Sequence, residues 1–194
     1  MRNKRSTMTS GLFGGRNKCV QRMVLMALMT AISLTIFVVE SLIPPVVPIV
    51  GVKLGLANMV TLFILLNGGW RPALAVLFAR LVLSTIFVGQ MMSFIFSLCG
   101  GLLAFAAMAL LTRLMGGRPV WFISACGAVF HNIGQMVAAV AFLTPVVLAY
   151  LPYLLIAGCI SGTLTGWLVD LFMKKMEPSG ALSTVHTVLE GGHS

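Results

Sequence analysis

The sequence predicts an all-α fold, a polytopic membrane helix bundle of about six transmembrane helices. Of its 194 residues, 59% are hydrophobic and only 9% are charged, and the mean hydropathy is +1.04. Soluble domains carry about 25% charged residues, so this composition cannot form a water-soluble surface. Long apolar runs recur across residues 23–173, and runs of about 18 or more apolar residues are typical of membrane helices.

Turn-forming residues divide the apolar runs into separate spans. Prolines and glycine pairs lie between the runs, where they favour turns over continuous helix. The predicted spans are 23–43, 54–67, 72–88, 94–114, 120–142 and 146–173. The first run is too long for the core of a cleaved signal peptide and lacks a small-x-small exit. We therefore expect it to remain in the mature protein.

Three segments are expected along the chain: a basic arm (1–22), the six-helix transmembrane domain (23–175) and a tail (176–194). The arm and the tail are polar and rich in Gly, Ser and Thr, and neither is expected to form a helix with an apolar face. Both are therefore predicted to be disordered. The tail histidines, His186 and His193, are expected to be solvated.

The distribution of basic residues predicts the topology. Eleven of the 13 Lys and Arg residues lie in the arm or in loops on one side of an alternating bundle, whereas Lys53 falls on the other side and Arg80 within a span. Basic residues concentrate on the cytoplasmic side of membrane proteins. We expect a multi-pass protein of the cell membrane with cytoplasmic termini, surrounded by lipid. Because these clusters account for the net charge of +9, no nucleic-acid partner is expected.

The second predicted span is short and follows an apolar segment, 44–51, that is interrupted by proline and glycine. Irregular apolar backbone at membrane depth is tolerated only when it is buried in protein or lines a cavity, and such segments often lie beside binding sites. The alternative is an ordinary interfacial loop.

Arg80 lies near the middle of the third span. Insertion scales put the cost of a charged residue there at about 2.5–3.5 kcal/mol, so Arg80 should face an interior cavity or a partner. One interpretation is a structural contact with helix carbonyls or an acid. The other is a residue that binds an anionic or polar ligand.

The fifth span carries three hydrogen-bonding side chains, His131, Asn132 and Gln135. His131 and Gln135 lie one turn apart on one helix face, and Asn132 is rotated by about 100°. Such groups near mid-membrane suit a polar ligand, although hydrogen bonds between helices would also explain them. No metal site is expected, because His131 is the only histidine in any span.

Further polar residues fall near the outer ends of the first two spans. Glu40, Lys53, Asn58 and Thr61 could together line the outer mouth of a pocket, with Asn58 and Thr61 on one face of the second span. For Glu40 and Lys53 alone, we favour a surface ion pair, which contributes about 0–1 kcal/mol. Asp170, beside Lys174 and Lys175, is interpreted as an interfacial charge.

Small residues mark two surfaces for close helix packing. Ala27-x-x-x-Ala31 lies in the first span, and Gly158-x-x-x-Gly162-x-x-x-Gly166 in the last. Small residues one turn apart let helix backbones approach closely. The glycine repeat could equally serve packing within the chain.

Enzyme signatures are missing from the sequence. It contains no acidic pair for magnesium-diphosphate chemistry, no phosphate-binding loop and no credible nucleophilic triad, and its four acids are too few for two-metal catalysis. We expect neither catalytic activity nor a cofactor.

Several motifs resemble one known family. They are Val52-Lys53-Leu54-Gly55-Leu56-Ala57-Asn58 with Val60-Thr61-Leu62, then Arg80, His131-Asn132-x-Gly134-Gln135 and Tyr150-Leu151-Pro152. Across residues 23–173, the chain resembles the Gx transporter family, also labelled heptaprenyl diphosphate synthase component I. That family is in turn similar to the substrate-binding S components of energy-coupling factor transporters. The resemblance implies an S-component-like fold, and a role for Ala27 and Ala31 in contacting a transmembrane coupling subunit.

Two functions remain open at this point. The first is a membrane substrate-binding subunit for uptake of a small polar or amphipathic molecule, energised by separate ATPase and coupling subunits. Its predicted substrate-binding residues are Arg80, His131, Asn132, Gln135, Asn58 and Lys53. The alternative is an accessory membrane component of heptaprenyl diphosphate or quinone metabolism, or of membrane electron transfer.

Overall fold

The protein is described here from a computed structural model that covers residues 5–42, 55–88, 91–143 and 145–190. Every regular element in these ranges is helical, which confirms the predicted all-α class. In chain order the elements are α1 (Arg5–Leu42), α2 (Asn58–Gly68), α3 (Trp70–Val88), α4 (Met91–Met115), α5 (Val120–Phe142), the 3-10 helix η1 (Pro145–Tyr150), α6 (Leu151–Met176) and α7 (Ala181–Glu190).

Five helices in the described ranges are long and apolar enough to cross a membrane: α1 from Cys19, α3, α4, α5, and η1 continued by α6. The second of the six predicted spans is not long enough to cross a membrane, so the described ranges hold five such helices rather than six. With 11 residues, α2 extends about 16 Å, whereas a bilayer core is about 30 Å thick. The protein is a membrane helix bundle of five long helices with a half-length helix among them.

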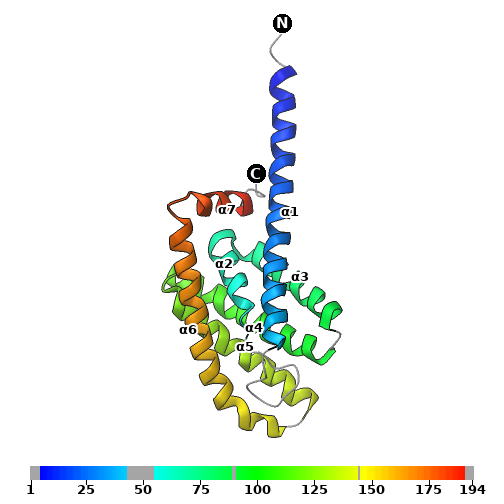
Figure 1. Ribbon diagram of the computed structural model, residues 1–194, viewed down its shortest axis with the longest axis vertical. Helices are drawn as coiled ribbons and strands as arrows, with labels where there is room; N and C mark the ends of the chain where they lie inside the picture. Colours follow the sequence, from blue (N-terminus) through cyan, green and yellow to red (C-terminus); the bar gives the residue numbers. More distant parts are fainter. Residues whose placement is uncertain (1–4, 43–54, 89–90, 144, 191–194) are drawn as a thin grey trace.

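Helix α2 forms the centre of the bundle. It contacts every other described α-helix, and it lies between α1, α3 and α6 in Figure 1. Nine of its 11 residues are buried, including the polar Asn58, Thr61 and Asn67. A helix surrounded on all sides needs apolar residues on all sides, which explains the uniformly apolar sequence of α2.

Helices α4, α5 and α6 pack closely because glycines remove side chains from their contacts. A Cβ added at Gly162 of α6 would lie 2.8 Å from the Cα of Ala125, and one at Gly166 would lie 2.6 Å from the Cα of Trp121. The Ser124 and Thr165 hydroxyls, 3.1 Å apart, add a hydrogen bond between α5 and α6. The glycine repeat therefore packs α6 against α5 within the chain, as the intramolecular alternative predicted.

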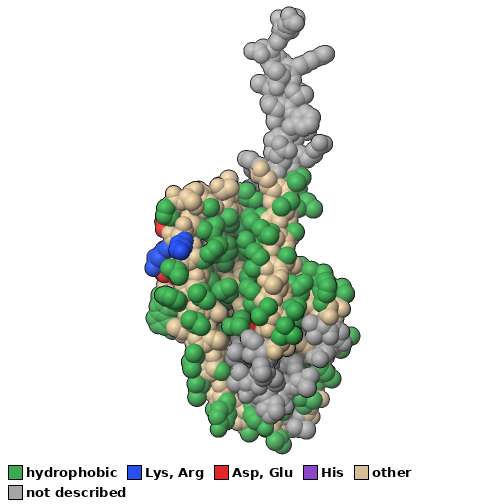
Figure 2. Space-filling model, in the orientation of Figure 1, with side chains coloured by type: hydrophobic (Ala, Val, Ile, Leu, Met, Phe, Trp, Pro, Cys, Tyr) green, Lys and Arg blue, Asp and Glu red, His purple; other side chains and the backbone are tan. Residues whose placement is uncertain are grey.

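One end of the bundle gathers the turns that carry basic residues. The α4–α5 turn meets α2 there, since a Cβ added at Gly117 would lie 3.2 Å from Leu66 Cδ2. The end of α2 also meets α7, since a Cβ at Gly68 would lie 2.7 Å from the Cβ of Leu189. Figure 2 shows Lys and Arg side chains grouped near the α7 end of α6, on a largely hydrophobic surface.

Helices occur within both terminal segments for which disorder was predicted. Helix α1 begins at Arg5, within the expected arm, and the tail forms α7. In α7, Leu182, Val185 and Leu189 recur at helical spacing and pack against the core cluster around α2. This apolar face is short, but its helical spacing is present in the sequence.

Candidate functional site

Arg80 of α3 is buried at the centre of the bundle, with 2% of its surface exposed. Its guanidinium lies 5.9 Å from the centroid of the Phe37 ring of α1, a distance at which cation–π attraction operates. Its Nε and Nη2 atoms have no hydrogen-bond partner among the described residues. Arg80 therefore faces the interior, as the sequence predicted. No helix carbonyl in the described part of the chain accepts a hydrogen bond from Nε or Nη2.

A pair of glycines in α4 separates Arg80 from the polar residues of α5. A Cβ added at Gly101 would lie 3.7 Å from Arg80 Nη2, whereas one at Gly100 would lie 2.8 Å from Gln135 Cγ and 2.9 Å from His131 Cε1. His131 also interacts electrostatically with Arg80. The two groups that the sequence singled out therefore lie beside adjacent glycines of α4.

His131 lies between the start of α2 and α4. Its Nδ1 is 3.1 Å from the Asn58 amide nitrogen; because an amide nitrogen only donates, Nδ1 is the acceptor. The ring also lies against Gly100 of α4, since a Cβ added there would lie 2.9 Å from His131 Cε1. On the α2 side, a Cβ added at Gly55 would lie 2.7 Å from His131 Cδ2, and Gly55 has a φ of 81°. A glycine is thus required at Gly55 both by its backbone conformation and by the close approach to His131.

Glu40 does not lie at the surface, where the predicted ion pair placed it. It is buried, with 6% of its surface exposed, and its carboxylate accepts hydrogen bonds from the backbone N–H of Gly55 at 2.6 Å and of Leu56 at 3.1 Å. Its charge also attracts Arg80, although the sequence suggested no acid at a matching depth. The reason is tertiary: the turn before α2 folds back onto the end of α1. Lys53, the proposed partner, lies outside the described residues, as does segment 44–51.

The side chain of Asn132 lies apart from those of Arg80 and His131. Its amide nitrogen donates to the carbonyl of Leu154 at 2.6 Å, and it also contacts Gly158 of α6. The rotation of about 100° between neighbouring helix positions directs Asn132 to α6, while His131 and Gln135 face α4. Asn132 therefore makes the interhelical hydrogen bond that the structural interpretation of this motif predicted.

The remaining candidates occupy two different places. Thr61 is buried in α2, and its hydroxyl has no partner among the described residues. Ala27 and Ala31 are exposed on α1 and line a groove of about 500 Å³ with Ala75 and Ala79 of α3. This surface is separate from the buried group, by which we mean Arg80, Glu40, Asn58, His131 and Gln135.

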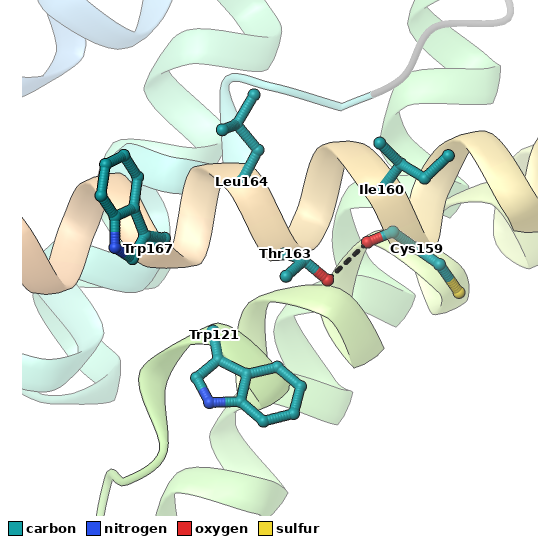
Figure 3. Close-up of a pocket in the computed structure, with 6 residues that line it drawn as sticks. All are labelled: Trp121, Cys159, Ile160, Thr163, Leu164 and Trp167. Atoms are coloured by element: carbon teal, nitrogen blue, oxygen red, sulfur yellow. Dashed lines mark hydrogen bonds between the residues drawn. The ribbon is translucent and has the colours of Figure 1, made fainter.

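A second surface groove, between α5 and α6, is largely apolar. Figure 3 shows Trp121 of α5 across from Trp167 and Leu164 of α6. The hydroxyl of Thr163, which also lines the groove, donates within α6 to the carbonyl of Cys159 at 2.7 Å. With its one hydroxyl already bonded, the groove offers little to a polar ligand, and we regard the buried group as the candidate site.

The buried group combines donors and acceptors that the described residues leave unpaired. Arg80 Nε and Nη2 are donors, and Asn58 Oδ1 is an acceptor; each belongs to a buried side chain. Leaving such an atom unsatisfied costs about 1–3 kcal/mol. The described residues contain no cluster of three metal-ligating side chains. The arrangement is suited to hydrogen-bonding a polar or anionic molecule.

Sequence reasoning missed the residues that shape the site rather than carry polar groups. These are Phe37, Gly100, Gly101 and the backbone of Gly55 and Leu56. The adjacent glycines at 100 and 101, inside an otherwise apolar span, were the available signal. Glycine at such a position indicates close approach by a neighbouring group.

Comparison with known proteins identifies one family. The family model described as heptaprenyl diphosphate synthase component I matches residues 29–172. This range includes every described residue of the buried group. No curated protein and no solved structure matches the chain. Because the match covers well over half of the sequence, the chain belongs to the heptaprenyl diphosphate synthase component I family.

Proposed function

We propose that this protein is a membrane substrate-binding subunit for uptake of a small polar or amphipathic molecule. The observation that carries the proposal is the buried Arg80, whose Nε and Nη2 lack partners in the described part of the chain. A guanidinium with two such donors at this depth is costly, so we expect the protein to use it for binding. Its proposed role is to bind an anionic or polar ligand beside His131 and Asn58.

Transport would require other subunits. The sequence has no phosphate-binding loop for ATP, so energy would come from separate ATPase and coupling proteins. The exposed Ala27 and Ala31, in the groove shared with α3, offer a surface on which a partner helix can approach closely. We assign this surface to the coupling subunit.

The family description favours a second candidate function, an accessory membrane component of heptaprenyl diphosphate or quinone metabolism, or of membrane electron transfer. In either case the chain is a binding or accessory subunit without catalytic residues of its own. Native mass spectrometry of the purified protein distinguishes the two. A co-purifying small polar or amphipathic metabolite supports uptake, whereas a prenyl diphosphate or a quinone supports the second candidate.

The coupling surface gives a direct prediction. Ala31→Trp is expected to reduce co-purification of a coupling subunit at least about tenfold, because a bulky side chain holds the partner backbone away from α1. Ligand binding and thermal stability should not change, since Ala31 is exposed. Val39→Trp, at another exposed position of α1, is the matched control. Equal co-purification of the Ala31→Trp and Val39→Trp proteins would argue against a partner at this surface.

We also propose that both termini are cytoplasmic, from the bias of Lys and Arg toward one side. Single cysteines, introduced into a variant lacking Cys19, Cys99, Cys126 and Cys159, test this topology. Cysteines replacing Gln90 or Thr144 should react with a membrane-impermeant thiol reagent added to intact cells. Cysteines near either terminus should react only after lysis. Labelling of the Gln90 cysteine only from the cytoplasmic side would reverse the assignment.

A further inference from the structure

The groove between α5 and α6 reaches the first turn of α5, at the end of the bundle that carries the basic turns. It has a volume of about 670 Å³, and apolar side chains make up most of its lining. Trp121 of α5 and Trp167 of α6 lie at the same end of the groove in Figure 3. A Cβ added at Gly166 would lie 2.6 Å from the Cα of Trp121, which places the first turn of α5 close to Trp167. Two large aromatic rings therefore flank the groove at this end.

Both tryptophans have the exposure and the free donor of residues that contact lipid. Trp121 is 50% exposed and Trp167 is 57% exposed, and neither indole N–H has a hydrogen-bond partner among the described residues. Tryptophan is enriched at the membrane–water interface, where its ring meets apolar chains and its N–H meets the polar layer. The two rings are thus placed to contact an acyl chain below the headgroups.

Positive charge lies just beyond the two tryptophans. Lys174 is seven residues after Trp167, and therefore on the same face of α6 and about 10 Å farther along the helix. Arg118 lies two residues before the start of α5. Of the two acids here, Asp170 is paired with Lys174 at 2.6 Å, and Glu177 lies past the end of α6. Arg118 is exposed and has no ion pair with a described acid, so its charge is available to a partner outside the chain.

We infer that this groove binds an anionic phospholipid, with an acyl chain between Trp121 and Trp167 and the headgroup phosphate at Arg118. An apolar groove that ends at a basic residue matches the two parts of such a lipid, and basic pockets between transmembrane helices bind anionic headgroups. A zwitterionic lipid would fill the groove equally well but would neutralise Arg118 less, so the headgroup charge decides the preference. The site shares no residue with the buried group and does not depend on the proposed function.

The start of α3 supplies an internal control. Trp70 and Arg71 lie at the same end of the bundle, with the Arg71 guanidinium 5.3 Å from the centroid of the Trp70 ring. Helix α3 packs mainly against α1, α2 and α4, away from the groove between α5 and α6. This pair therefore offers a tryptophan and an arginine at the same end of the bundle without the groove.

The test measures quenching of tryptophan fluorescence by phospholipids with brominated acyl chains. The full-length Trp70→Phe protein retains Trp121 and Trp167 of the three tryptophans in the chain. It is placed, one molecule per disc, in phosphatidylcholine nanodiscs that contain brominated phosphatidylglycerol or brominated phosphatidylcholine. Because the two brominated lipids share the same acyl chains, a difference in quenching reports the headgroup. Phosphatidylglycerol should associate with the groove about fivefold more strongly, the effect of one basic residue near an anionic headgroup.

Two further substitutions, made in the Trp70→Phe protein, test the two parts of the site. Arg118→Gln should remove the roughly fivefold preference for phosphatidylglycerol, whereas Arg71→Gln should leave it unchanged. Thr163→Phe, which places a ring in the groove, should lower quenching by phosphatidylglycerol to the level of phosphatidylcholine. Thr35→Phe is its matched control, because Thr35 is also exposed and also donates to the carbonyl four residues earlier in its helix.

Equal quenching by the two brominated lipids in the Trp70→Phe protein would overturn the inference. A preference for phosphatidylglycerol that survives Arg118→Gln or Thr163→Phe would also overturn it, because the preference would then come from charge spread over this end of the bundle. Displacement of brominated phosphatidylglycerol by a tenth as much geranyl diphosphate would show that a phospholipid is not the preferred occupant. Arg118 is exposed, so Arg118→Gln still decides if the Thr163→Phe protein does not fold.

Discussion

Replacing Arg80 with methionine is expected to weaken binding of the co-purifying ligand about 10- to 100-fold without lowering the melting temperature. A hydrogen bond to a charged group contributes about 1.5–3 kcal/mol, which corresponds to roughly this change in affinity. Folding should not suffer, because Arg80 Nε and Nη2 donate to no described group, and Glu40, whose charge attracts Arg80, keeps its hydrogen bonds from the backbone of Gly55 and Leu56. Methionine also avoids the cost of a charge at membrane depth.

The structural interpretation of Arg80 predicts the reverse order of effects. If Arg80 mainly held the helices together, Arg80→Met would lower the melting temperature first, and any loss of affinity would follow from unfolding. Arg71→Met is the matched control, since it removes the same charge from the exposed start of α3. Gln135→Leu should lower affinity in the same way, because Gln135 packs against Gly100 beside the site. Unchanged affinity in folded Arg80→Met protein would refute the pocket.

Gly162→Leu is expected to destabilise the protein by about 1–3 kcal/mol or more, the usual cost of forcing extra atoms into a packed interface. The first added atom would lie 2.8 Å from the Cα of Ala125 and 3.0 Å from the carbonyl oxygen of Ser124. Both are backbone atoms of α5, so relief requires α5 and α6 to separate. Thermal unfolding in a mild detergent, followed by size-exclusion chromatography, measures the effect.

The control for this prediction is Cys159→Leu, on the exposed face of the same helix. It adds a comparable side chain where the surroundings can yield, and the melting temperature should change little. Separation of α5 from α6 would also strain the bond from Asn132 to Leu154. Gly162→Leu should therefore reduce ligand binding indirectly, in proportion to the loss of folded protein. A Gly162→Leu melting temperature equal to that of Cys159→Leu would contradict this account of the interface.

The sequence alone determined the class of the protein and the residues worth testing. A charged fraction of 9% excludes a soluble surface, and the positions of proline and glycine divide the apolar runs into helices at nearly the right places. Arg80, His131 and Gln135 stood out because polar groups are rare and costly in an apolar environment. The shortness of the second apolar run was also visible, although the run was counted among the six predicted spans; α2 is too short to cross a bilayer.

Only the tertiary structure decided which of these groups meet. Periodicity within one helix cannot show that Glu40 bonds to Gly55 and Leu56, because these residues become neighbours through the turn that leads into α2. The contact of Asn132 with α6, rather than with Arg80, likewise depends on which helix faces each side of α5. Leu189 of α7 is buried only because Gly68 leaves room for it. In each case the outcome depends on contacts between separate helices, which the local pattern of one helix does not encode.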